Sequence, residues 1–187
     1  GIRDKLVPGV QTWCSSDLPL EWLARLEDGG QKERLSCVSC GWTHWNNPVP
    51  VLAAIVQYQG KILLARNAAW SGRRFALITG FMEAGESPEA GISREVMEET
   101  SLRVTDLSLI GVYEHLRMNQ VLIVYHAHAE GDEVRLSPEL AEYKLYKPED
   151  IICWPSGTGR GVADWQRKLG IEPRFMDWDE RARLNIE

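Results

Sequence analysis

The chain has 187 residues, 44% of them apolar, which is enough for one domain of ordinary size and a small appendage. Its 27 acidic and 21 basic residues leave a formal net charge of -6, which disfavours broad binding to the phosphate backbone of nucleic acids. No apolar run approaches the roughly 20 residues that a membrane span needs, and the N-terminal stretch GIRDKLVPGV lacks the basic start and apolar core of a secretion signal. We therefore expect a cytoplasmic protein without a membrane anchor or a nucleic-acid partner.

The first 47 residues differ from the rest in composition, because they hold three of the four cysteines and four of the eight tryptophans. The turn signal EDGGQ lies between two short runs, EWLARL and KERLSC, and predicts a small β-hairpin. The stretch Asn46-Asn47-Pro48 then interrupts the pattern. We expect residues 1–47 to form a β appendage and residues 48–187 to form the main domain.

The main domain is predicted to begin with strands. Two apolar runs on either side of Gln59-Gly60 predict a β-hairpin, and a short strand is expected to end at Gly80. A helix follows, with Ser87 as its N-cap, Pro88 in its first turn, and an apolar stripe with helical spacing that extends to Thr100.

Further strands and a second helix are expected after it. The runs LRVTDLSLIGVYEHL and QVLIVYHAHAEG predict two strands joined near Met118-Asn119, and AEYKLYKPEDI predicts a strand that leads into a helical turn. The run GVADWQRKLG predicts a late helix that ends at Gly170. Together these elements predict an α/β fold in which helices flank a mixed sheet.

Three glutamates gather on one face of the first predicted helix. Glu98 and Glu99 lie three and four residues after Glu95, so the three carboxylates converge and repel one another. Oxygen-liganded divalent cations, Mg²⁺ or Mn²⁺, would remove this repulsion, and they bind through a few carboxylates together with substrate phosphate oxygens. For the three glutamates alone, the alternative is a solvated acidic face.

The three glutamates belong to a longer pattern, which runs from Gly80 to Leu102. Its constrained positions are Gly80, Glu86, Arg94, Glu95, Val96, Glu98, Glu99 and Leu102. Their spacing resembles the Nudix box, G-x5-E-x7-R-E-U-x-E-E-x-G-U, in which U is an apolar residue. The chain departs from the box at one position, where Ser101 replaces glycine. Glycine would suit a helix C-cap with positive φ, which serine adopts at some cost.

The resemblance implies a Nudix α/β/α sandwich that hydrolyses a nucleoside diphosphate linked to another group, such as ADP-ribose, FAD or NADH, with Mg²⁺ or Mn²⁺ as cofactor. It implies metal ligands at Glu95, Glu98 and Glu99, and backbone ligation or close approach at Gly80. Glu95 and Glu98 would also be catalytic, and Arg94 would orient a glutamate. For Arg94 the alternative is a surface ion pair worth under about 1 kcal/mol.

The same resemblance bears on the partners of the chain. It implies a small-molecule nucleotide diphosphate as the substrate. A homodimer is the oligomeric state that we predict. The alternative function is a non-catalytic Nudix module that senses a ligand or binds a protein. Retention of all the box glutamates favours the enzyme.

The N-terminal cysteines point to a second metal. Cys37 and Cys40 have the C-x2-C spacing of a zinc knuckle, and Cys14 and Asp17 stand where a zinc ribbon has its other knuckle. Because a carboxylate oxygen can bind Zn²⁺, a structural site with three cysteines and Asp17 is chemically feasible, and His44 is a competing ligand. The alternative is a decayed knuckle in an appendage held by tryptophan packing.

The appendage and the box together make the chain similar to the zinc-ribbon NADH pyrophosphatase branch of the Nudix hydrolases. That branch carries the signature SQPWPFPxS, which is missing between Gly111 and Val121, so the similarity does not extend to NADH specificity. Glu142, within ELAEYKLY, resembles a late glutamate of the branch that approaches the metals from another strand and would add a catalytic carboxylate. The alternative for Glu142 is a surface residue.

Four residues are candidates for substrate binding. Arg73 and Arg74 precede the strand of the box and carry charges that suit substrate phosphates, with a solvated loop as the alternative. Phe75 and Tyr113, like Trp70, offer aromatic faces on which a base can stack. Core packing is the alternative for these aromatic residues.

Overall fold

The structure, a computed structural model, describes residues 5–7, 10–12, 20–25, 32–37, 41–72 and 74–183. The chain divides into two compact units, Gly1–Asn47 and Pro48–Glu187, and the boundary falls in the Asn46-Asn47-Pro48 stretch. No helix in the described ranges is long and apolar enough to cross a membrane.

The first unit consists of short antiparallel strands. β1 (Lys5–Val7) pairs with β2 (Val10–Thr12), and β3 (Leu20–Arg25), β4 (Lys32–Cys37) and β5 (Thr43–His44) form a second small sheet. Cys37 is buried, and its N–H donates to the carbonyl of Trp42 (2.8 Å). Cys14, Asp17 and Cys40 lie outside the described residues, so the zinc site stays a prediction.

Six strands of the second unit form one mixed sheet. They are β6 (Val49–Tyr58), β7 (Lys61–Asn67), β8 (Ile78–Phe81), β9 (Arg103–His115), β10 (Gln120–Glu130) and β11 (Leu140–Tyr146). Their order is β11-β7-β6-β10-β9, with β8 paired to β6. β6 and β10 are parallel, and the other pairs of this sheet are antiparallel. β6 therefore connects the strand that begins the box with the rest of the sheet.

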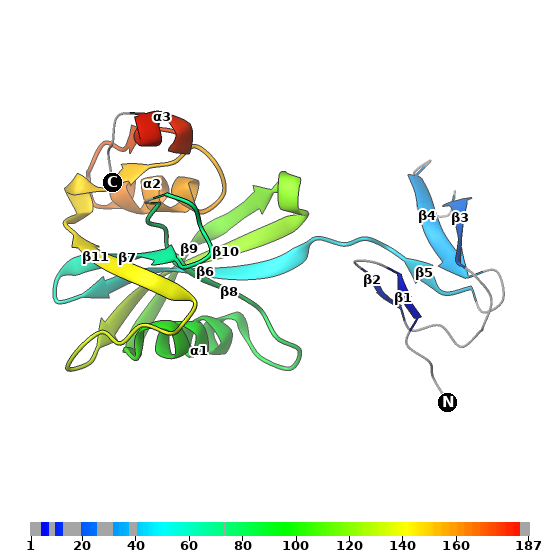
Figure 1. Ribbon diagram of the computed structural model, residues 1–187, viewed down its shortest axis with the longest axis horizontal. Helices are drawn as coiled ribbons and strands as arrows, with labels where there is room; N and C mark the ends of the chain where they lie inside the picture. Colours follow the sequence, from blue (N-terminus) through cyan, green and yellow to red (C-terminus); the bar gives the residue numbers. More distant parts are fainter. Residues whose placement is uncertain are drawn as a thin grey trace. The chain divides into compact units, whose positions relative to one another are not determined.

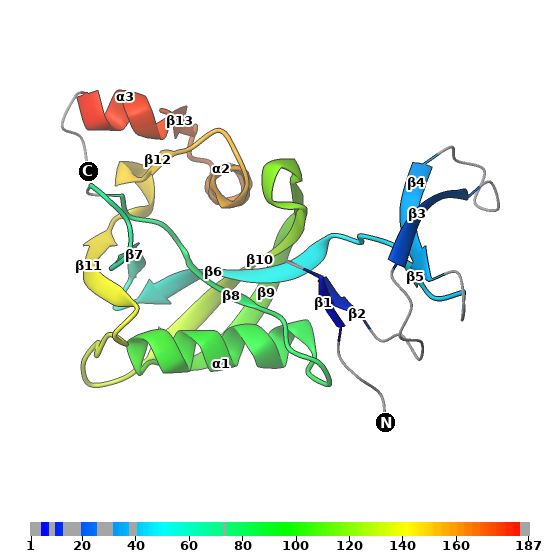
Figure 2. The same cartoon turned by 45° about the vertical axis from the view of Figure 1, so that its right-hand side comes forward.

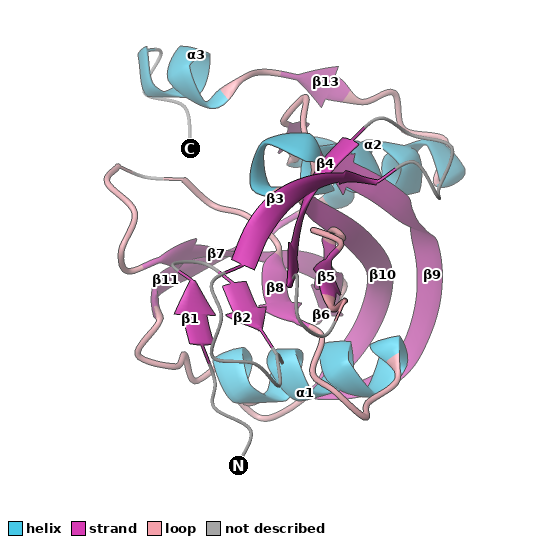
Figure 3. Cartoon of the chain, turned by 90° about the vertical axis from the view of Figure 1, so that its right-hand side faces the viewer, coloured by secondary structure: helices cyan, strands magenta, loops and turns pink. Residues whose placement is uncertain are grey.

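Helices cover both faces of this sheet, as Figure 1 and Figure 2 show. α1 (Pro88–Thr100) packs against β6, β8 and β9, and α2 (Thr158–Lys168) packs against β9 and β10 from the opposite side. Figure 3 shows the strands between these two helices. The remaining short elements are η1 (Leu116–Met118), η2 (Pro148–Asp150), β12 (Ile152–Cys153), β13 (Arg174–Phe175) and α3 (Trp178–Arg183). The second unit is thus the α/β/α sandwich that the resemblance implies.

Alternation along β6 explains how one strand serves two cores. Successive side chains of a strand point to opposite faces of its sheet. Every second residue from Val51 to Ile55 is buried in the core on the side of α2, and every second residue from Leu52 to Val56 is buried on the side of α1. Because both faces are covered, this part of β6 is apolar without interruption.

α1 begins and ends where the sequence predicts. The side chain of Ser87 accepts a hydrogen bond from the N–H of Ala90 (3.2 Å), and Pro88 occupies the first turn. At the other end Ser101 adopts φ 61°, in the left-handed region, and its N–H donates to the carbonyl of Met97 (2.9 Å). A left-handed serine therefore takes the place of the box glycine.

We expect Ser101→Gly to stabilise the protein by about 0.5–1 kcal/mol, because glycine adopts positive φ without steric cost. Little is lost with the hydroxyl, which donates one long hydrogen bond to the carbonyl of Arg135 (3.3 Å). Urea unfolding of the wild type, Ser101→Gly and Ser101→Ala measures the effect. The alanine variant, which keeps the steric cost of a Cβ atom, should be no more stable than the wild type. A glycine variant equal to the alanine variant would refute the explanation.

Candidate functional site

The turn from β8 into α1 places the box residues around one hollow. β8 pairs with β6 so that Gly80 lies opposite Leu52, and α1 packs against both strands. The hollow between them has a volume of about 480 Å³. Its walls include Thr79, Gly80, Phe81, Glu83, Arg94, Glu95, Glu98, Glu99, Gln120 and Glu139. The fold thus brings together the residues that the box pattern singles out.

Arg94 is the centre of an ion-pair network in this hollow. Its guanidinium donates to both carboxylate oxygens of Glu86, from Nε to Oε2 (3.2 Å) and from Nη2 to Oε1 (3.0 Å). Nη1 donates to Glu95 Oε1 (2.9 Å) and to Glu98 Oε2 (3.0 Å). The hydrogen bond with Glu86 is the main cause that raises the pKa of Arg94, and the same bond lowers the pKa of Glu86. Arg94 therefore fixes the positions of three box carboxylates from one side chain.

Glu86 also ties the loop before α1 to the helix. Its Oε1 accepts a hydrogen bond from the N–H of Glu83 (2.7 Å), and Nη2 of Arg94 reaches the carbonyl of Phe81 (3.4 Å). The end of β8, the loop and α1 are thereby joined through one arginine and one glutamate.

Gly80 lets the carboxylate of Glu95 lie directly on β8. A Cβ atom at position 80 would stand 1.9 Å from Glu95 Cδ, closer than any real contact. The backbone of Gly80 does not have the positive φ that favours glycine. The requirement for glycine here is therefore steric, and it concerns the placement of Glu95.

Glu139 reaches the hollow from a loop outside the box. The loop between β10 and β11 is held on the C-terminal end of α1, where the N–H of Arg135 donates to the Thr100 carbonyl (3.0 Å) and the N–H of Ser137 donates to the Glu99 carbonyl (3.0 Å). These bonds satisfy carbonyl groups that a helix end leaves without intrahelical partners. They also place Glu139 beside the box glutamates.

The cluster disfavours its own negative charge. Burial, followed by the charges of Glu95, Glu139 and Glu98, raises the pKa of Glu99 to about 7. The raised pKa indicates that no nearby positive charge among the described residues offsets the burial of Glu99 and the repulsion from its neighbouring carboxylates.

The donor set of the hollow fits a hard divalent cation. Glu95, Glu98, Glu99 and Glu139 offer carboxylate oxygens, the ligands that Mg²⁺ and Mn²⁺ prefer. Within the described residues, no three His, Cys, Asp or Glu side chains already converge closely enough to hold an ion. In this arrangement Arg94 Nη1 is the hydrogen-bond partner of both Glu95 and Glu98. Glu98 is the more exposed of the two, with a side chain 59% accessible, and is the freer to turn.

The structure distinguishes two glutamates that lie close together in the sequence. Glu142, on β11, is paired in register with Arg66 of β7 and forms an ion pair with it (3.5 Å), and it does not line the hollow. Glu139 precedes β11, and its carbonyl accepts from the N–H of Ala68 (2.8 Å). Sequence reasoning missed Glu139, and the available signal was its place in the turn before the predicted strand.

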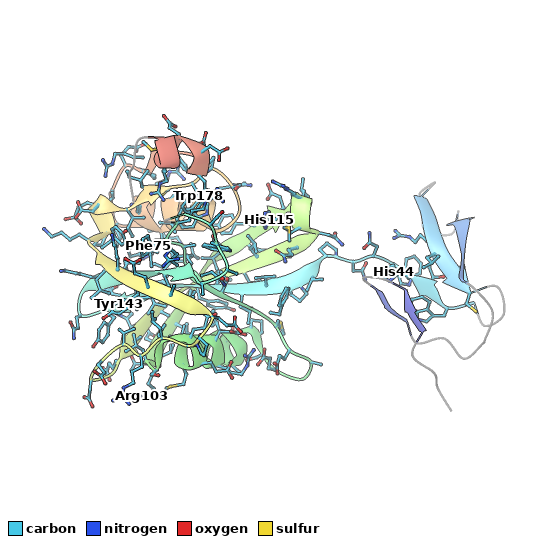
Figure 4. All side chains as sticks on the ribbon, in the orientation of Figure 1. His44, Phe75, Arg103, His115, Tyr143 and Trp178 are labelled. Carbon is cyan, nitrogen blue, oxygen red and sulfur yellow. The ribbon has the colours of Figure 1, made fainter. Side chains whose placement is uncertain are left out.

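Two of the three aromatic candidates, Phe75 and Tyr113, lie in the core, whereas Trp70 is 43% exposed. Phe75 is 1% exposed, and Tyr113 is also buried, with its hydroxyl donating to Asp164 Oδ2 (2.8 Å). In Figure 4 Phe75 lies within the sandwich. Neither ring presents a free face to a base, and the packing alternative describes both.

A second cavity of about 610 Å³ adjoins the acidic hollow, because Val51, Thr79 and Gln120 line both. Of the two arginines considered for phosphate binding, Arg74 lines this second cavity, and Arg73 lies outside the described residues.

The domain is thus an α/β/α sandwich with an acidic hollow, which is formed by a strand, a loop and a helix that carries an arginine among glutamates. The family model of the NUDIX domain matches residues 46–165. The chain belongs to this family.

Known proteins are similar in sequence to parts of the chain. The NAD-capped RNA hydrolase NudC of Mycobacterium tuberculosis is 40% identical over 73 residues, which are 39% of this chain and 23% of that protein. NudC of Pseudomonas putida is 27% identical over 139 residues, 74% of this chain and 50% of that protein. The chain therefore spans half or less of these curated relatives. A NUDIX hydrolase structure from Nitrosomonas europaea has a TM-score of 0.67 at 24% identity, covers 88% of this chain and 98% of its own, and shows the same fold.

Proposed function

We propose that the chain hydrolyses the diphosphate bond of a nucleoside diphosphate linked to another group, with Mg²⁺ or Mn²⁺ bound. The observation that carries the proposal is the acidic hollow, in which all three box glutamates of α1 and Glu139 gather around a space that admits a diphosphate. Carboxylates that repel one another in a concave site are typical of functional sites. Structural ion pairs instead join groups of opposite charge.

The residues of the hollow would have different roles in the hydrolysis. Glu95, Glu98, Glu99 and Glu139 would hold the cation, which when bound neutralises the diphosphate and lowers the pKa of a coordinated water. Glu98 Oε2 is the candidate base that accepts a proton from the attacking water, because this side chain reaches solvent and leaves Arg94 most easily. Arg94 keeps Glu95 in place. The fourth carboxylate is Glu139 in this proposal, since Glu142 is occupied by Arg66.

The names of the relatives narrow the substrates to be tried. The NudC proteins are named for hydrolysis of NAD-capped RNA. A dinucleotide that contains a nicotinamide nucleotide is therefore the first candidate, with ADP-ribose and FAD as further members of the class.

Turnover of a substrate panel tests the proposal. The purified chain, incubated with Mg²⁺ or Mn²⁺ and NAD⁺, NADH, ADP-ribose or FAD, is expected to release AMP from at least one of them. Glu98→Gln is expected to lower kcat by about 10²–10⁴-fold, the range of a lost general base. Glu130→Gln is the matched control, since Glu130 only pairs with Arg103 at the surface.

Two outcomes would count against the proposal. If no diphosphate is cleaved with either cation, the non-catalytic ligand-sensing or protein-binding module is the better reading. If Glu98→Gln keeps wild-type turnover, the enzyme survives and the assignment of Glu98 fails.

A further inference from the structure

The second cavity differs in chemistry from the acidic hollow that it adjoins. Large apolar side chains reach it from three separate elements, Trp70 from the loop after β7, Met118 from η1 and Trp178 from α3. Its charged lining residues are Arg74 and Arg117, His115 also lines it, and no carboxylate is among the described residues that line it. Among the described residues, the carboxylates thus line the acidic hollow and not the second cavity, whose charged groups are arginines.

The aromatic wall combines a fixed part with an open part. The Trp178 ring lies 5.1 Å from the ring of Trp154, which is buried, so α3 is anchored by this contact. Trp70 and Met118 are 43% and 56% exposed. The N–H of Trp70 donates to the Asn67 carbonyl (3.2 Å), which fixes the loop at its start. Apolar surface held in this way at a cavity mouth is suited to the face of a planar ring.

The two arginines have little to neutralise them. Arg117 is exposed and makes no ion pair within the described part of the chain. Among the described residues, the ion-pair partner of Arg74 is Asp179 at the long distance of 4.0 Å, and the Asp179 side chain is almost fully exposed. Pairs of this kind contribute little. Both guanidinium groups are therefore available to an anion inside the cavity.

We propose that this cavity binds the part of the substrate beyond the scissile diphosphate, and that this part is a nucleotide carrying a further phosphate ester. The inference rests on the proposed function, since the acidic hollow holds the scissile diphosphate. A plain nucleoside would satisfy the aromatic wall and leave both arginines without an anion. A phosphate ester on the ribose satisfies both, because a phosphate accepts charge-assisted hydrogen bonds from guanidinium groups. Trp70, Trp178, Arg74 and Arg117 are thus specificity residues.

Two substrate pairs test the inference, each differing by one phosphate: NADP⁺ against NAD⁺ for the 2′ position, and coenzyme A against dephospho-coenzyme A for the 3′ position. With Mg²⁺ or Mn²⁺ bound, kcat/KM is expected to be about tenfold or more higher for the phosphorylated member of at least one pair, mainly through KM. Arg117→Gln should bring that ratio close to one. Arg103→Gln is the matched control, because Arg103 lies on the α1 side of the sheet, away from His115 and Trp178 in Figure 4, and should keep the ratio.

The outcomes separate this inference from the proposed function. If diphosphates are hydrolysed and kcat/KM is no higher for the phosphorylated member of either pair, the arginines bind the scissile diphosphate itself. The inference then fails, and the proposed function stands. If nothing is hydrolysed, calorimetric titration of the metal-free protein decides. Adenosine 3′,5′-bisphosphate or 2′,5′-bisphosphate should then bind about tenfold more tightly than AMP, and Arg117→Gln should abolish the difference. Equal binding of the three nucleotides would overturn it.

Discussion

Replacing Arg94 by glutamine is expected to lower kcat/KM for the diphosphate substrate by about 100-fold or more, and to destabilise the metal-free protein. The guanidinium holds Glu86 through two hydrogen bonds and holds Glu95 and Glu98 through a third nitrogen. Without it the acidic hollow keeps all its carboxylates and loses the one cation among the described residues that line it. Displacement of catalytic groups by about 1 Å costs on the order of 100-fold in rate, so both effects follow from one lost side chain.

Arg94→Lys separates charge from geometry. Lysine keeps the positive charge but offers one ammonium in place of a planar fork, so it cannot serve Glu86 and the helix glutamates together. We expect its kcat/KM to stay within about tenfold of the glutamine variant. Arg167→Gln is the control, since Arg167 also lies on a helix but forms an exposed pair with Asp164 (2.7 Å), and it should change stability by less than about 0.5 kcal/mol. Wild-type rates in Arg94→Lys would show that charge alone suffices. Steady-state kinetics and thermal unfolding in EDTA measure both effects.

The elements that the sequence predicts well are those whose signals are local. The start of α1 follows from Ser87 and Pro88, and its end follows from the apolar stripe that extends to Thr100. The apolar run of β6 reflects burial on both faces of the sheet. Gly80 and Arg94 meet in the hollow because strand, loop and helix are consecutive in the chain.

The parts of the site that depend on distant segments are harder to predict. Glu139 joins the hollow only because backbone hydrogen bonds from Arg135 and Ser137 hold its loop on the end of α1. Phe75 follows two arginines in a polar stretch, and its burial is decided by the surrounding sandwich. The aromatic wall of the second cavity unites residues about a hundred positions apart, Trp70 and Trp178. Such contacts are set by tertiary packing, which local patterns do not encode.

Gly80→Ala is expected to reduce kcat by about 10–100-fold while leaving the fold nearly as stable as the wild type. The added methyl group would stand 1.9 Å from Glu95 Cδ, so the Glu95 carboxylate must move away from β8. This carboxylate is the far end of a flexible side chain, so its movement lowers the free energy of unfolding only slightly. The same movement breaks the contact with Arg94 and the placement of a carboxylate that the proposed function requires. Kinetics and urea unfolding of one preparation measure both quantities.

Gly60→Ala should behave in the opposite way, and the contrast identifies the cause. Gly60 has φ 75° in the β6–β7 turn and open space around it, so alanine there costs about 1 kcal/mol of stability and should leave turnover unchanged. A shorter carboxylate at position 95 gives a second check. In a Glu95→Asp background, which is itself less active, Gly80→Ala should cost less than it does in the wild type, because the clashing Cδ is gone. Strictly additive losses in the double variant would mean that Gly80 acts through some contact other than Glu95, and the steric account of the box glycine would have to be abandoned.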